Sequence, residues 1–199
     1  ATPAAHSGAE LARGSISRLL RNAAAMEIRL HGRGGQGGVT CAKLLAACYA
    51  RLGKHVQTFG DYAGERSGAP VRAYTRVDDA PVTNRNKVYR PDHVVVLDEH
   101  LLGADVLDEL ARGGILLVNT SAPTASFDAR FASFTLATVD ATAIARRHGI
   151  GTKTVVIVNT TIAGAFARVA GIPLDVLEAT YRALGFLGNF AAAREAWES

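Results

Sequence analysis

The stretch "EIRLHGRGGQGGVTCAKLLAACYARLG", residues 27–53, decides the fold of this chain. It opens with alternating apolar residues, Ile28 and Leu30, as a short strand does. Five glycines follow within residues 32–38, and apolar residues then recur at helical spacing up to Gly53, which is placed to end the helix. The stretch therefore predicts a strand, a tight glycine loop and a helix in direct succession.

The remainder of the chain alternates between the same two patterns. Apolar runs predict strands at residues 55–59, 71–77, 93–98, 114–120 and 133–140. Helical spacing predicts helices at residues 101–114, 141–149, 161–171, 173–185 and 189–199. Such alternation predicts an α/β fold with a doubly wound, mostly parallel sheet and helices on both faces. We expect a single domain over residues 26–199 and an N-terminal extension over residues 1–25, which packs on this domain or a neighbouring chain, or is a presequence.

Composition limits the classes of function. The 199 residues are 48% hydrophobic and 20% charged, which is enough apolar material for one sizeable core. The formal net charge is +4, but the arginines are scattered, so we expect no nucleic-acid partner. No apolar run reaches the length of about 18 residues that a membrane span requires. Cys41 and Cys48 lie about 10 Å apart along one predicted helix, too far for a disulfide, so we expect reduced core thiols and a cytoplasmic protein.

The glycine loop matches a dinucleotide-binding pattern. Gly32, Gly34 and Gly37 fit G-x-G-x-x-G between a strand and a helix, where backbone amides attract an anion. Asp61, after the next predicted strand, is a loose match for the acidic residue that binds ribose. A dinucleotide or another anion is therefore one interpretation of the loop.

Other residues of the loop favour a different interpretation. Gly35 and Gly38 are additional glycines that the G-x-G-x-x-G pattern does not require, and no nucleotide contact requires a glutamine at position 36. A glycine-rich corner also allows a strand and a helix to pack closely, or a partner chain to approach. The motif alone leaves anion binding and close packing or subunit contact both open.

A second stretch, "YAGERSGAPVRAYTRV", residues 62–77, carries Glu65 and Arg66 in a loop and Arg72 and Arg76 on the following strand. Arginine binds phosphates and carboxylates through two parallel hydrogen bonds. Arg72 and Arg76 share one face of the strand, and we expect this face to be exposed. It is either a binding surface or a face that contacts only solvent. Both glycine-bearing loops should lie at the carboxyl edge of the sheet, where α/β proteins bind ligands.

Three motifs in order, "HGRGGQGGVTCAKLLA", "GERSGAPVRAYTRVDDAPV" and "YRPDHVVVLDEHLL", resemble the gamma subunit of 2-oxoacid:acceptor oxidoreductases of the pyruvate:ferredoxin type. Later segments, "GGILLVNTS", "VDATAIA" and "VNTTIAGAFARVAGI", follow in the family's order. The resemblance spans about residues 26–188, so residues 1–25 depart from it and have no assigned role.

The resemblance implies a multi-subunit enzyme that converts a 2-oxoacid and coenzyme A into acyl-CoA, carbon dioxide and a reduced ferredoxin or other acceptor. Thiamine diphosphate, Mg and the [4Fe–4S] clusters would belong to partner alpha, beta and ferredoxin-like delta subunits, and this chain would bind none of them alone. The sequence agrees, since it has no Cys-x-x-Cys spacing for a cluster and no Gly-Asp-Gly segment. The 2-oxoacid (pyruvate by default, aryl or branched otherwise) and an additional flavin/NAD subunit stay open.

The resemblance also implies the candidate site. Residues facing coenzyme A or a partner would be Gly32, Arg33, Gly34, Gly35, Gln36, Gly37, Glu65, Arg66 and Arg72. They would cover an active site built by other subunits, so we expect no catalytic residue and no metal ligand in this chain. Asp98 and Glu99 follow a buried strand and are expected to begin a helix. Two alternatives are a stand-alone Rossmann-like dinucleotide-binding oxidoreductase and an interaction module without a ligand.

Overall fold

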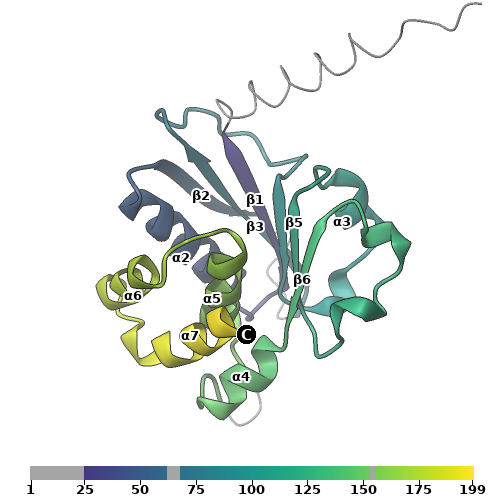
Figure 1. Cartoon of the computed structure of the whole chain (residues 1–199). Coiled ribbons are helices and arrows are strands. Elements are labelled where there is room, and N and C mark those ends of the chain that lie inside the picture. Colours follow the sequence, from purple (N-terminus) through teal and green to yellow (C-terminus); the bar gives the residue numbers. More distant parts are fainter. Residues whose placement is uncertain (1–24, 62–67, 153–155) are drawn as a thin grey trace, which may run out of the picture.

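The computed structural model describes residues 25–61, 68–152 and 156–199, which form one six-stranded sheet with helices packed on it (Figure 1). The strands are β1 (Met26–Arg33), β2 (His55–Asp61), β3 (Pro70–Asp78), β4 (His93–Val96), β5 (Ile115–Asn119) and β6 (Thr135–Val139). The helices are α2 (Gly38–Arg51), α3 (Ala104–Glu109), α4 (Ala141–Arg147), α5 (Asn159–Val169), α6 (Leu174–Ala183) and α7 (Phe190–Glu198). Four short 3-10 turns accompany them: η1 (Glu99–Leu101), η2 (Thr124–Ser126), η3 (Ala129–Phe131) and η4 (Leu187–Asn189). Almost all of the predicted extension, residues 1–24, lies outside the described residues.

The strand order is β2-β3-β1-β4-β5-β6. Strands β1, β4, β5 and β6 are parallel, whereas β3 runs antiparallel to both of its neighbours, β1 and β2. The predicted α/β fold with a mostly parallel sheet is confirmed. The antiparallel strand was not predicted, and its cause is the short connection from β2 to β3, because a parallel crossover needs a dozen or more residues.

Helices cover both faces of the sheet, as predicted, but unequally (Figure 1). The larger core packs side chains such as Ile28, Leu30 and Leu117 against α2 and the C-terminal helices. The smaller core lies on the other face of the sheet. There Val94 and Val96, two alternate residues of β4, pack against α3 and the turns around it. Strands β4 and β5 are therefore apolar on both faces, as their continuous apolar runs predicted.

Two predicted helices differ from the structure at their starts. The helix expected over residues 101–114 is only α3, because extended Gly103 (φ −105°, ψ 175°) separates it from η1, and it also ends early, at Glu109, because Leu110 is extended (φ −72°, ψ 133°). The α5 helix already includes Asn159, with Val158 before it as the N-terminal flanking residue. The side chain of Asn159 accepts a hydrogen bond from its neighbour, the amide of Thr160 (2.7 Å).

The face that carries Arg76 on β3 is buried, which corrects the expectation of an exposed strand face. Arg76 is 1% exposed, and its guanidinium binds the carboxylate of Glu27 on β1 (Nε–Oε1 2.6 Å). It also donates to the backbone carbonyls of Asn84 (2.9 Å) and Asn86. Residues 79–92, which contain no helix or strand, thus reach this face at Asn84 and Asn86, and we name them the covering segment. Burial of the arginine is tolerated because its charge is paired and its donors are hydrogen-bonded.

Helices α5 and α7 pack at a point where no side chain fits. A Cβ atom added to Gly164 would lie 2.0 Å from the carbonyl oxygen of Ala193. We therefore predict that Gly164→Ala destabilises the chain by about 1–3 kcal/mol, since overpacking outweighs the ~1 kcal/mol gain in helix propensity. Urea unfolding would measure this loss. Gly188→Ala is the control, because a Cβ there meets nothing within 4 Å; an equal effect of both changes would contradict the packing argument.

The pair formed by Arg76 and Glu27 gives a second prediction. Arg76→Met should lower the free energy of unfolding by about 3 kcal/mol, because it leaves the carboxylate of Glu27 without its partner. Adding Glu27→Gln should restore a part of this loss, since the unpaired charge is then removed. Denaturant unfolding of the single and double variants checks both statements. Strictly additive losses would show that the two side chains are not energetically coupled.

Candidate functional site at the carboxyl edge of the sheet

The glycine loop joins the carboxyl end of β1 to the start of α2. Gly35 (φ +96°) and Gly37 (φ +79°) have left-handed backbone that favours glycine. The side chain of Gln36 turns back and accepts a hydrogen bond from the amide of Arg33 (2.7 Å), and the Gln36 amide donates to the Arg33 carbonyl (3.0 Å). Gln36 thus closes the loop, which explains a residue for which the nucleotide pattern had no role.

One glycine of the motif serves close packing. A Cβ at Gly37 would lie 2.1 Å from Nδ2 of Asn159, the first residue of α5. The loop therefore abuts the side chain of Asn159, and the left-handed backbone of Gly37 (φ +79°) favours glycine here whether or not a ligand binds. Gly35 differs, because a Cβ there would meet nothing within 4 Å. The structure therefore supports the close-packing interpretation for Gly37, whereas the loop is accessible from outside at Gly35.

Arg33 ties the loop to the ends of two other strands. Its Nε donates to the carboxylate of Asp98 after β4 (2.6 Å), and its Nη1 donates to the carbonyl of Gly68 before β3 (3.2 Å). Partial burial alone would raise the pKa of Asp98, but the guanidinium of Arg33 and the amide of His100 outweigh it and hold that pKa below its ordinary value. Asp98 is therefore a charged structural anchor that also begins η1, as predicted for it.

The two glycine-bearing loops meet at this edge, as the sequence predicted. The amide of Gly34 donates to the carbonyl of Ala69 (2.8 Å), and the amide of Gly68 donates to the carbonyl of Gly34 (3.2 Å). Glu65 and Arg66 lie outside the described residues, so their position relative to the loop stays a prediction.

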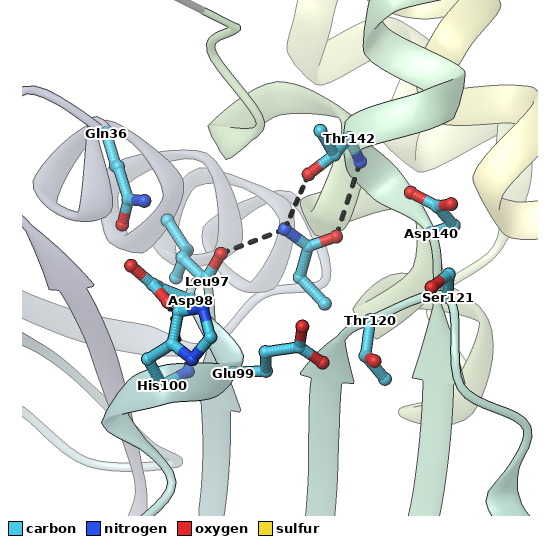
Figure 2. Close-up of a pocket in the computed structure, with 10 residues that line it drawn as sticks. Gln36, Leu97, Asp98, Glu99, His100, Thr120, Ser121, Asp140 and Thr142 are labelled. Atoms are coloured by element: carbon cyan, nitrogen blue, oxygen red, sulfur yellow. Dashed lines mark hydrogen bonds between the residues drawn. The ribbon is translucent and has the colours of Figure 1, made fainter.

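A first pocket of about 290 Å³ opens between the carboxyl ends of β4, β5 and β6 (Figure 2). Its lining consists of polar side chains around one leucine: Gln36, Leu97, Asp98, Glu99, His100, Asn119, Thr120, Ser121, Asp140 and Thr142. The buried Asn119 amide donates to the carbonyl of Leu97 (2.9 Å) and to Oγ1 of Thr142 (3.0 Å), as the dashed lines in Figure 2 mark. Asn119 thereby fixes the end of β4 against the start of α4 and shapes the pocket floor.

A second pocket of about 560 Å³ lies beside the first, and His100 lines both. Its lining is His31, Gly32, Asp61, Pro70, Val71, Arg72, His100, Leu101 and Gly103. Two predicted site residues, Gly32 and Arg72, thus come together here from β1 and β3. Asp61 faces the same pocket but is paired with Lys87 (2.7 Å). Arginine and histidine side chains make this pocket better suited to an anion than the first, which carries three carboxylates.

Asp61 does not lie where a dinucleotide-binding unit has its ribose-binding acidic residue. Asp61 ends β2, but β3 lies between β2 and the glycine-bearing strand β1. Neighbouring strands are about 4.8 Å apart, so Asp61 lies roughly 10 Å from β1 across the sheet. In a dinucleotide-binding unit that carboxylate belongs to a strand adjacent to the first. This geometry counts against a stand-alone dinucleotide-binding oxidoreductase.

The cysteines do not form a cofactor site. Cys41 and Cys48 are buried and unbridged in α2, which confirms the predicted core thiols. Burial raises the pKa of both thiols, so neither is the thiolate that a metal or iron–sulfur cluster requires. Across residues 25–61, 68–152 and 156–199, no group of three His, Cys, Asp or Glu side chains has the arrangement of a metal site. In the same part of the chain, no helix combines the length and the hydrophobicity of a membrane span.

Sequence reasoning missed several residues of the first pocket. Four lining residues were not among the candidates, although Asn119 ends the parallel strand β5, Thr120 follows it, and Asp140 and Thr142 follow β6. Polar residues directly after buried parallel strands meet at the same sheet edge, and this signal could have identified them.

Comparison with known proteins assigns the family. The sequence model for pyruvate ferredoxin/flavodoxin oxidoreductase matches residues 27–198. Pyruvate synthase subunit PorC of Methanothermobacter marburgensis is 42% identical, over 87% of this chain and 96% of its own length. The common gamma subunit of the pyruvate/ketoisovalerate oxidoreductases of Thermococcus litoralis is 44% identical with the same coverage, 87% and 96%.

Solved structures support the same family assignment. The crystal structure of pyruvate oxidoreductase subunit PORC from Thermotoga maritima has a TM-score of 0.72 and 36% identity, covering 88% of this chain and 96% of that one. A 2-oxoglutarate:ferredoxin oxidoreductase from Magnetococcus marinus shares the fold (TM-score 0.65, 18% identity), covering 87% of this chain and 30% of that one. The chain described here belongs to the gamma (PorC) subunit family of pyruvate and 2-oxoacid ferredoxin oxidoreductases.

Proposed function

We propose that this chain is built into a heteromeric, cytoplasmic oxidoreductase that converts a 2-oxoacid and coenzyme A into acyl-CoA, carbon dioxide and a reduced ferredoxin or other acceptor. Its partners would be the alpha, beta and ferredoxin-like delta subunits, which would hold thiamine diphosphate, Mg and the [4Fe–4S] clusters. The family assignment over most of the chain supports this proposal. The buried thiols of this chain, which do not fit a cluster, agree with that division of cofactors.

The role proposed for this chain is to cover the active site and to contact coenzyme A. The glycine loop, from Gly32 through Arg33, Gly34, Gly35 and Gln36 to Gly37, would face the cofactor or a partner together with Arg72, Glu65 and Arg66. The observation that carries this proposal is the shared lining of the second pocket by Gly32 and Arg72. The Magnetococcus marinus structure that shares this fold has coenzyme A and succinyl-CoA bound, which is consistent with the proposal.

The electrostatics of the edge favour the second pocket for the coenzyme A phosphates. A guanidinium such as Arg72 binds a phosphate through charge-assisted hydrogen bonds. In the first pocket Arg33 pairs with Asp98, but the carboxylates of Glu99 and Asp140 would repel a phosphate.

The choice of 2-oxoacid would rest with the partner subunits. The relative from Thermococcus litoralis is described as a subunit common to pyruvate and ketoisovalerate oxidoreductases, two enzymes with different substrates. A shared subunit cannot contain the groups that distinguish those substrates. Pyruvate is therefore the first substrate to test, and aryl or branched 2-oxoacids are the next.

The first experiment isolates the assembly through an affinity tag on this chain in its own cells. Native mass spectrometry should find larger subunits with thiamine diphosphate and iron–sulfur clusters. A chain that emerges alone or only as a homo-oligomer, and that binds NAD(H) or NADP(H) on titration, would contradict the proposal in favour of the dinucleotide alternative.

The contact with coenzyme A makes a separate prediction. Arg72→Ala should raise the KM for coenzyme A on the order of 10- to 100-fold in the assembled enzyme, because a charge-assisted hydrogen bond to phosphate is lost. The KM for the 2-oxoacid should stay unchanged. Arg112→Ala is the matched control, since Arg112 is an exposed arginine just before β5, at the opposite edge of the sheet. Equal KM values for coenzyme A in both variants would exclude the proposed contact.

A further inference from the structure

The covering segment, residues 79–92, is unusual for a connection inside a compact domain. It links β3 to β4 without any helix or strand. Connections of this length that lack secondary structure are uncommon, and ordered ones usually have a functional role. Its course over the sheet is also costly, because it places the charged side chain of Arg76 in the interior.

The segment is held in one conformation from beneath. The buried guanidinium of Arg76 donates to the carbonyl of Asn84 (2.9 Å) and to that of Asn86. The amide of Asn86 donates to the side chain of Asn84 (2.9 Å), and the Val88 side chain, 3% exposed, packs inward. The carbonyl of Pro91 accepts from the amide of Ala111 (3.0 Å) and fixes the far end. A surface fixed in this way loses little conformational entropy when another molecule binds it.

The segment exposes an aromatic side chain, Tyr89, that is next to Arg90 in the chain and four residues after Arg85. Tyr89 is 67% exposed, the highest value among the exposed large hydrophobic residues in the part of the chain that the structure describes. Arg85 and Arg90 are exposed too, and neither forms an ion pair with any described residue. Lys87 is different, because Asp61 neutralises it. Tyr and Arg are the residue types most enriched where protein surfaces contact each other and where single residues contribute most to binding.

We propose that Arg85, Tyr89 and Arg90 form a docking surface for a partner subunit whose facing surface presents carboxylates around an apolar recess. This proposal rests on the proposed function, since it takes the chain to be part of a heteromeric enzyme. The recess would receive the Tyr89 ring, and the carboxylates would bind the guanidinium groups through paired hydrogen bonds. Nucleic acid fits less well, because Asp79 and Asp92 are the two end residues of the segment and Asp78 precedes it, and these carboxylates would repel a phosphate backbone.

The test compares two substitutions on this surface in the tagged, co-purified enzyme. Arg85→Glu with Arg90→Glu, and separately Tyr89→Ala, should each weaken the association of this chain with its partner subunits by about tenfold or more. The dissociation constant would be measured by mass photometry over a dilution series, at two salt concentrations. The isolated variants should keep their unfolding midpoint, because all three side chains are exposed. The matched control is Arg146→Glu with Arg194→Glu, two exposed arginines on α4 and α7 that should leave association unchanged.

Each outcome decides the proposal. Loss of partner subunits in the surface variants but not in the control supports it. Unchanged association in both surface variants overturns it, and so does a loss of self-association alone, which would assign the surface to a second copy of this chain. A wild-type chain that co-purifies with no partner would overturn the proposed function as well. A changed KM for coenzyme A with unchanged assembly would point to a ligand contact and also contradict docking.

Discussion

The close approach of Gly37 to Asn159 is the constraint on which the carboxyl edge of the sheet depends. A methyl group on Gly37 would lie 2.1 Å from the side-chain amide nitrogen of Asn159, and the left-handed backbone there disfavours any side chain. The contact fixes the start of α2 against the start of α5, and the closed turn around Gln36 follows from the same backbone path. Both pockets lie at strand ends next to the glycine loop. Their geometry therefore depends on the backbone conformation of this loop.

The parallel and antiparallel halves of the sheet bury different kinds of side chain. In the parallel half, β4 and β5 place valine and leucine on both faces. In the antiparallel half, buried Arg29 of β1 pairs with Glu109 of α3, and buried Arg76 of β3 pairs with Glu27 of the neighbouring strand β1. Paired charges of this kind stabilise a fold less than apolar packing does, but they leave hydrogen-bonding capacity near the surface. The second pocket and the covering segment both lie on this charged half.

Local patterns in the sequence were sufficient for the parallel half and insufficient for the antiparallel half. The run "HVVVLD" and the glycine loop identify β4, β1 and α2, because their period and turn chemistry are local properties. The alternation of Arg72 and Arg76 suggested an exposed face, since the partner that buries Arg76, Glu27, lies 49 residues away in the chain. The position of Asn119 at the end of a buried strand is a local signal, but its bonding partners are distant in the chain. Its bonds to Leu97 and Thr142 exist only once the sheet has formed.

The buried thiols of α2 have a consequence for how this chain meets reactive chemicals. Cys41 and Cys48 lie against Tyr181 and Thr180 in the interior, and burial disfavours their ionised forms. Alkylating agents and peroxides attack the thiolate, so the folded chain is a poor target for both. Modification of these cysteines then requires that α2 and α6 separate first. The two sulfur atoms accordingly act as internal reporters of opening, and the rate of their labelling measures how often this core exposes itself to solvent.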